Sequence, residues 1–289
     1  MWFLFAFIAA VLWSVVSTFD KFSIHSLLTR ASQGLIISGM FSGIGLCFAD
    51  WGNVDSNLVL WSIVAGLLLQ FSQFCYFKAL KDEEVGDLTA FGSAYPLLVA
   101  LLTIPLGKYL TLYQWLGILL VSIGVIVLRW KRAQSNSNNT FFHILGYVVG
   151  LALSSLVVSE VLDAYDFFSA LGPYCLGLIV GGLLPLMFTS ERREFFRVFN
   201  TIKPKLWLFG WIELLNVLAV ACEVYAIGIG HPALVNTVAS TEPAIVFVMA
   251  YFFGNIKGLE HMFPKVSQIH HKLLITTVII IGLGLITWN

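Results

Sequence analysis

The chain has 289 residues, of which 58% are hydrophobic and 11% are charged, and its formal net charge is zero. Its mean hydropathy is +0.88. Soluble domains contain about 25% charged residues, so this composition excludes an ordinary soluble protein. A helix needs about 20 apolar residues to cross a bilayer, and little of the chain remains once such spans are assigned. The composition therefore also excludes a separate soluble catalytic domain.

The hydropathy pattern predicts an all-α integral membrane fold with ten transmembrane helices. The first span is a full-length apolar run with no basic segment before it and no small-residue cleavage site after it, so we expect a helix and not a signal peptide. We place the ten spans at residues 2–20, 31–49, 58–80, 86–106, 112–130, 141–160, 167–188, 205–228, 232–254 and 272–288.

The distribution of basic residues predicts the orientation in the membrane. Of the 16 lysines and arginines, only Lys108 lies in an even-numbered loop or at a terminus, and all the others lie in odd-numbered loops. Basic residues accumulate in cytoplasmic loops. We therefore expect a multi-pass protein of the cell (inner) membrane with both termini outside.

An internal repeat divides the chain into two halves. A shift of 147 residues aligns the third and fourth spans with the eighth and ninth. Over 38 of these positions six residue pairs are identical, including Pro96 with Pro243 and Gly107 with Gly254. Because each half has five spans, an odd number, the halves must be inverted across the membrane. We expect repeats at 1–132 and 140–289, joined by the polar linker 133–139.

Polar residues inside the spans indicate where function resides. Glu213, Asn216 and Glu223 fall within roughly 80° of one another on one face of the eighth span. An ionisable group in hydrocarbon costs about 2.5–3.5 kcal/mol or more, so such groups face a bundle interior or a wet cavity. The alternative is that these carboxyls are protonated and only hold helices together. Glu242 is as readily a helix–helix contact as a site residue.

We predict a substrate site from the polar faces of the spans, with Pro96 and Pro243 as helix kinks beside it. Glu213 and Glu223 are the candidates for proton coupling, since a carboxyl removed from water takes up a proton more readily. The predicted substrate-binding residues are Glu213, Asn216, Asn236, Ser240, Gln70, Gln73, Tyr95, Ser17, Ser155 and Trp13.

Four segments resemble a known family, the EamA-type members of the drug/metabolite transporter superfamily. They are residues 12–21 with Trp13 and Lys21, residues 76–84, residues 93–108 with their echo at 240–255, and residues 115–124. The resemblance implies a central cavity walled by spans 1, 3, 4, 6, 8 and 9. Members often have Leu-Gly-Glu where this chain has Lys108, and are usually drawn with cytoplasmic termini. Both departures leave the transport direction open.

These observations predict a secondary transporter working by alternating access. The deep ionisable groups are carboxyls, which favours a cationic or zwitterionic solute such as an amine or amino acid. We expect proton coupling, contacts with membrane lipid, no nucleic-acid partner, no cofactor or metal, and a monomer or homodimer. Walker A, HExxH, GxSxG and DDxxD motifs are absent, so we expect no enzyme.

Three other interpretations remain open. One is an intramembrane lipid-handling protein or enzyme, which would need a metal or nucleophile constellation that the sequence does not provide. Another is a structural subunit of a membrane complex. Finally, the histidines of the last loop, His261, His270 and His271, would allow a zinc or pH-sensing role, although loop histidines at a surface are the usual case.

Overall fold

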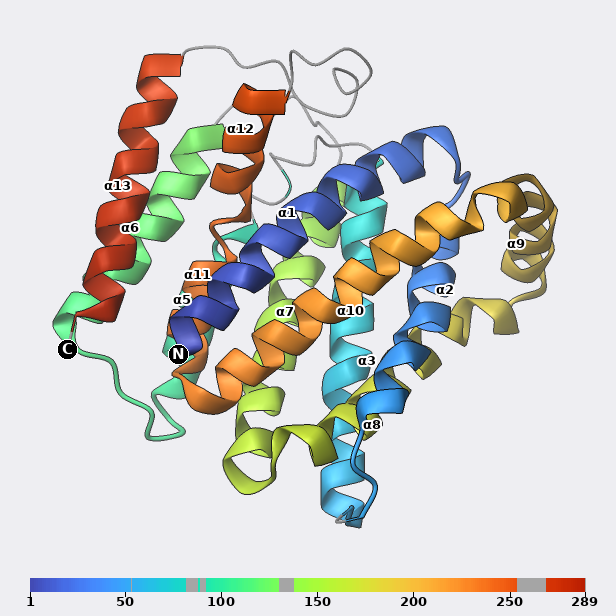
Figure 1. The fold of residues 1–289 in the computed structure, drawn as a ribbon, viewed down its shortest axis with the longest axis horizontal. Coiled ribbons are helices and arrows are strands. Elements are labelled where there is room, and N and C mark those ends of the chain that lie inside the picture. Colours follow the sequence, from blue (N-terminus) through green and yellow to red (C-terminus); the bar gives the residue numbers. More distant parts are fainter. Residues whose placement is uncertain (53, 82–87, 89–91, 130–137, 254–268, 289) are drawn as a thin grey trace.

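The computed structural model describes residues 1–52, 54–81, 88, 92–129, 138–253 and 269–288, and this part of the chain is helical with no strand (Figure 1). The elements are α1 (Trp2–Ser26), α2 (Ala31–Phe41), η1 (Ser42–Phe48), α3 (Ser56–Ala79), α5 (Tyr95–Thr103), α6 (Leu112–Arg129), α7 (Asn138–Ala164), α8 (Phe167–Leu183), η2 (Leu184–Met187), α9 (Thr189–Ile202), η3 (Lys203–Lys205), α10 (Leu206–Ile229), α11 (Pro232–Ala239), α12 (Glu242–Phe253) and α13 (Ile269–Thr287).

The predicted all-α membrane fold is confirmed. Each of the ten predicted spans contains helix, and seven segments are long and apolar enough to cross a bilayer by length and composition. Two shorter apolar helices, Leu112–Val127 and Leu274–Thr287, lie in the fifth and tenth spans. These two helices, from α6 and α13, pack together at one edge of the molecule (Figure 1).

Some predicted features differ from the structure or lie outside the described residues. The sequence analysis assigned residues 189–202 to a loop, but they form α9, whose apolar face buries Phe195, Val198 and Ile202. The last two residues of the predicted linker begin α7, and the rest of it is not described. The described residues also exclude Asn255, His261 and the side chains of His270 and His271.

Both predicted kink prolines lie in the first turn of a helix. Pro96 lies in the first turn of α5, and Pro243 lies in the first turn of α12, after α11 has ended at Ala239. Proline lacks a backbone N–H, which the first turn of a helix does not need. The ninth span is therefore discontinuous, with Ser240 and Thr241 in the gap between α11 and α12.

Glycines set how closely the central helices approach. A Cβ on Gly66 of α3 would lie 2.3 Å from the Tyr174 carbonyl oxygen of α8. A Cβ on Gly177 of α8 would lie 2.3 Å from the Ile63 carbonyl oxygen. Small residues allow this backbone contact between membrane helices. Helix α3 consequently packs along both α7 and α8, and α1 packs along α10 (Figure 1).

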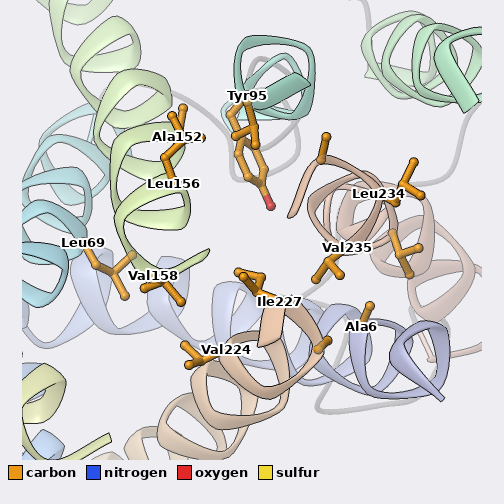
Figure 2. Packing of buried hydrophobic residues seen from close by; sticks show 14 of the residues in the cluster. Ala6, Leu69, Tyr95, Ala152, Leu156, Val158, Val224, Ile227, Leu234 and Val235 are labelled. Carbon is orange, nitrogen blue, oxygen red and sulfur yellow. The ribbon is translucent and has the colours of Figure 1, made fainter. Parts of the chain in front are cut away.

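The largest apolar core cluster lies where helices from both halves of the chain converge. Leu156 of α7, Val224 of α10 and Val235 of α11 belong to this cluster together with Tyr95. In Figure 2 the Tyr95 side chain projects from α5 toward the middle of the cluster, with its oxygen at the inner tip. This core positions the polar groups that lie beside it.

Candidate functional site

A central cavity of about 80 Å³ lies among α1, α3, α5, α7, α10 and the α11–α12 break. These elements belong to the six spans that the resemblance implied. Its lining residues are Trp13, Val16, Ser17, Asp20, Leu69, Gln73, Tyr76, Phe77, Gly92, Ser93, Tyr95, Tyr147, Leu151, Glu213, Asn216, Glu223, Ala239, Ser240, Glu242 and Pro243. A water needs about 10–15 Å³ of such space, so the cavity has room for several waters.

Four carboxyl groups line this cavity: Asp20, Glu213, Glu223 and Glu242. The described lining contains no lysine, arginine or histidine to balance them. Four ionised carboxylates in so small a space repel one another, and each loses hydration. Protons or a cationic guest must therefore offset part of the negative charge.

Glu223 is held by aromatic donors from two other helices. The indole Nε1 of Trp13 donates to one carboxyl oxygen at 3.3 Å. The Tyr95 hydroxyl donates to the other oxygen at 3.5 Å. Each carboxyl oxygen of Glu223 thus accepts one hydrogen bond. Because Trp13 comes from α1 and Tyr95 from α5, the two bonds hold the Glu223 side chain in one direction between these helices.

Glu213 belongs to a buried polar chain that crosses three helices. The Asn216 amide nitrogen donates to a Glu213 carboxyl oxygen at 2.8 Å and approaches the Ser38 hydroxyl at 3.4 Å. The Ser38 hydroxyl donates in turn to the Gln73 amide oxygen at 3.2 Å. Glu213 and Asn216 are only 6% and 8% exposed, so this chain links α10 to α2 and α3 away from bulk water.

Glu242 has one buried carboxyl oxygen that is left unpaired among the described residues. Among the described residues, its Oε1 has no hydrogen-bond partner, and neither has the Tyr76 hydroxyl. Glu242 lies in the first turn of α12, where the helix dipole favours a negative charge. Glu242 and Tyr76 thus offer an unused acceptor and an unused hydroxyl to whatever enters the cavity.

The structure brings most of the predicted site residues together and leaves four elsewhere. Around the cavity are Trp13, Ser17, Gln73, Tyr95, Glu213, Asn216, Glu223, Ser240 and Pro243. Outside its lining are Gln70, Asn236, Ser155 and Pro96. The Asn236 amide nitrogen donates to the Ser155 hydroxyl at 2.5 Å, which joins α11 to α7. Gln70 lines two other cavities, one of them shared with Gln73 and Asn216, and is 2% exposed.

The sequence analysis did not assign Asp20, Tyr76 or Tyr147 to the site, yet all three line the cavity. A signal for Asp20 was present, because Asp20 follows Ser17 by three residues and Trp13 by seven, which puts them on one helix face. Tyr76 likewise follows Gln73 by three residues. Tyr147 carried no such signal, since the polar residues counted on its span lie further along the helix.

A charged cluster lies at the end of the protein opposite α9. The Lys108 ammonium lies 2.6 Å from Asp163 and 3.0 Å from Glu160. Partial burial alone would lower the pKa of Lys108, but its bonds to Asp163 and Glu160 outweigh burial and raise it. These ion pairs connect the loop after α5 to the end of α7. They also hold Lys108, the single basic residue of the even-numbered loops, in place.

Comparisons with known proteins agree with this architecture. The model of the EamA-like transporter family matches residues 1–130. No curated protein matches the sequence. A solved structure described only as "Crystal structure of protein" superposes with a TM-score of 0.67 at 17% identity, covering 98% of this chain and 96% of that chain. An identity this low shows a shared fold alone.

Proposed function

We propose that this chain, whose residues 1–130 match the model of the EamA-like transporter family, is a secondary transporter of a small cationic or zwitterionic solute. The observation that carries the proposal is the central cavity, lined by four carboxyls and, among its described residues, by no basic side chain. An anionic solute such as a sugar phosphate would need arginine or lysine there. A solute with an amine supplies the missing positive charge.

The aromatic walls support the same class of solute. Trp13, Tyr76, Tyr95 and Tyr147 line the cavity beside the carboxyls. Aromatic faces attract cations by about 0.5–2 kcal/mol, most strongly where water is excluded. An organic cation would therefore gain from both the carboxyls and the rings. Gln73, Asn216 and Ser240 would supply hydrogen bonds to the remainder of the solute.

We further propose that protons and solute compete for the carboxyls. When the cavity is empty of solute, protons offset the mutual repulsion of the acids. A bound cation would replace one or more of these protons and release them. Glu223, fixed by Trp13 and Tyr95, and Glu213, bound by Asn216, are the proposed coupling groups. Movement of the cation would then be linked to opposite movement of protons.

Alternating access is the proposed mechanism. Two inverted repeats, 1–132 and 140–289, would rock around the cavity, and the break between α11 and α12 lies where such motion needs flexible backbone. Ligand pockets of drug size usually measure about 300–1,000 Å³, and this cavity of about 80 Å³ is smaller. A larger solute therefore requires the halves to separate, which suits a transport cycle.

The loop charges support an orientation in a cell (inner) membrane with both termini outside. The chain would act as a monomer or homodimer, as a carrier and not as an enzyme. Asn236 and Ser155 would hold α11 on α7 without touching the solute. Cysteine accessibility at Lys108 and at Arg193, each replaced singly by cysteine, would check the orientation from outside intact cells.

The experiment that tests the function is proton flux in liposomes containing the purified protein. A panel of amines, amino acids and sugar phosphates is added outside, and internal pH is followed with a trapped dye. Glu213→Gln and Glu223→Gln are compared with wild type. Glu194→Gln is the matched control, because Glu194 pairs with Arg197 on α9 and is not among the cavity-lining residues.

We expect a nitrogenous solute to drive proton movement in wild type and in Glu194→Gln, and we expect either cavity substitution to abolish it. Solute entry without proton movement, unchanged in both cavity variants, would make these acids structural and end the coupling proposal. If no solute moves at all, an intramembrane lipid-handling protein or a structural subunit becomes the better account.

A further inference from the structure

A second, larger cavity opens between α2, α3 and α8 on the side of α9. Its volume is about 720 Å³. Its lining residues are Arg30, Ala31, Ser32, Leu35, Leu67, Gln70, Phe71, Phe74, Lys78, Lys81, Gly181, Leu184, Pro185, Phe188 and Glu191. We call this cavity the lateral groove. It has no lining residue from α10, α11 or α12, and it is separate from the carboxyl-lined cavity.

The lateral groove has a basic end and an apolar end. Along α3, its lining residues run from Leu67 through Phe71 and Phe74 to Lys78, and Lys81 follows in the turn after the helix. The helical residues among these lie on one face of α3, which lines the groove. Toward the C-terminal end of α3 the lining changes from apolar side chains to cationic ones. From Leu67 to Lys78 the helix rises about 16 Å at 1.5 Å per residue. One leaflet of bilayer hydrocarbon is about 15 Å thick, half of the whole core.

Arg30, Lys78 and Lys81 line the basic end, and Glu191 is the single carboxylate among the described lining residues. Glu191 is already engaged on both oxygens, by Arg30 at 2.6 Å and by the Ser32 hydroxyl. Lys78 is exposed, and its ammonium lies 5.4 Å from the centre of the Phe74 ring. Even without Lys81, the two cations Arg30 and Lys78 outnumber the single carboxylate Glu191 among the described lining residues.

The apolar end contains a polar group with no partner. Gln70 lines the groove, is 2% exposed, and neither its amide nitrogen nor its amide oxygen has a hydrogen-bond partner among the described residues. An unpaired buried amide destabilises the protein, because it has lost its hydrogen bonds to water and gained none in return. A bound molecule that brings a carbonyl oxygen to the depth of Gln70 would remove this cost. The walls around it, Leu184, Pro185 and Phe71, are otherwise apolar.

We propose that the lateral groove binds one anionic phospholipid, with its phosphate at Lys78 and Arg30, its ester region near Gln70 and an acyl chain along Phe71 and Leu67. The occupant follows from the order of chemistry in the groove: positive charge, then a hydrogen-bond donor, then hydrocarbon-facing side chains. Basic pockets between membrane helices bind anionic headgroups in this manner. Charge complementarity selects an anionic lipid over a zwitterionic one.

The test counts lipids bound to delipidated protein in neutral detergent by native mass spectrometry. The probes are dioleoyl-phosphatidylglycerol and dioleoyl-phosphatidylcholine, which share acyl chains and differ in net charge, and glycerol 3-phosphate, which has no chains. The variants are Lys78→Gln and Leu184→Trp, the second of which fills the groove. Arg193→Gln is the matched control, because Arg193 is exposed on α9 and does not line the groove.

We expect one phosphatidylglycerol to bind at least about fivefold more tightly than phosphatidylcholine, and Lys78→Gln to remove about fivefold of that preference. Leu184→Trp should weaken both lipids, and Arg193→Gln should leave both unchanged. Equal binding of the two lipids by wild type, or equal losses in Lys78→Gln and Arg193→Gln, would overturn the proposal. Competition by glycerol 3-phosphate as strong as that of the lipid would also overturn it, by identifying a site for free phosphate.

Discussion

The segment containing α3 and α5 and the segment containing α10 and α12 occupy matching places in the sequence but carry different chemistry. A shift of 147 residues pairs Gly66 with Glu213, Tyr76 with Glu223 and Tyr95 with Glu242. Apart from Gly66, all these residues line the same cavity. The first segment thus contributes two neutral hydroxyls, whereas the second contributes three carboxyls.

The paired positions Gly66 and Glu213 also differ in how closely their helices pack against neighbours. Gly66 lets α3 touch the backbone of α8, and α3 packs along α8 over much of its length. Helix α10, which has Glu213 at the paired position, contacts α2 only sparsely. Gly66 therefore lies at a close backbone contact between helices, whereas Glu213 lies in the buried polar chain.

The largest effect should come from disrupting the close contact between α3 and α8. Gly66→Leu should abolish folding, because its Cβ alone would lie 2.3 Å from the Tyr174 carbonyl oxygen and backbone cannot yield cheaply. Size-exclusion chromatography of the detergent-extracted protein measures this. Gly284→Leu is the matched control in α13, since nothing lies within 4 Å of a Cβ there. Equal, monodisperse yields of both variants would refute the role given to Gly66.

The next largest effect should be a difference between substitutions at the paired positions Tyr95 and Glu242. Glu242→Gln should lower solute transport by about 10–100-fold, since a hydrogen bond to a charged group contributes about 1.5–3 kcal/mol. Tyr95→Phe removes only the 3.5 Å hydrogen bond to Glu223 and should raise KM about two- to tenfold, as for one neutral hydrogen bond. Initial rates in proteoliposomes measure both. Similar losses in the two variants would erase the functional difference between the segments.

A smaller effect should appear at the link between α7 and α11. Ser155→Ala, Asn236→Ala and the double variant form a thermodynamic cycle around the hydrogen bond of 2.5 Å. We expect a coupling energy of about 0.6–1.7 kcal/mol, the range found between membrane helices. Unfolding free energies in micelles supply the four values. A coupling energy of zero would show that the two side chains do not stabilise the contact.

The smallest effect should be a pH dependence in the turn between α10 and α11. His231 Nδ1 accepts a hydrogen bond from the Ala233 N–H at 3.2 Å, and burial lowers the pKa of His231 from its usual value. Near its usual pKa of about 6.5, the unfolded chain binds more protons at His231 than the folded chain does. Stability contributed by this turn is therefore complete above about pH 6.5 and is lost as pH falls further.

The melting temperature of wild type and of His231→Asn, measured across this pH range, tests the histidine. Asparagine keeps a capping side chain without a titrating ring, so the two curves should separate only at acid pH. His143→Asn is the control for a histidine outside the turn. Parallel curves for wild type and His231→Asn would show that protonation of His231 does not cause the loss of stability at acid pH.

The hydropathy of the sequence predicted the ten spans, and the polar helix face that contains Glu213, Asn216 and Glu223 indicated the cavity. The sequence could not say which neighbour each polar group meets. Asn236 shares its helix face with Ser240, yet Asn236 bonds Ser155 while Ser240 lines the cavity. Helix α9 was missed because its apolar face is too short to register as a span. An amphipathic pattern at Phe195, Val198 and Ile202 could have revealed it.

The measurement that tests the central claim most directly is the number of protons released when an organic cation binds to the purified protein. Titration calorimetry in two buffers of different ionisation enthalpy gives this number between about pH 5 and 8. The probes are the amines from the liposome panel. We predict that wild type releases protons on binding and that Glu223→Gln and Glu213→Gln release fewer. Cation binding with no proton release at any pH in this range would contradict the claim that solute and protons share these carboxyls.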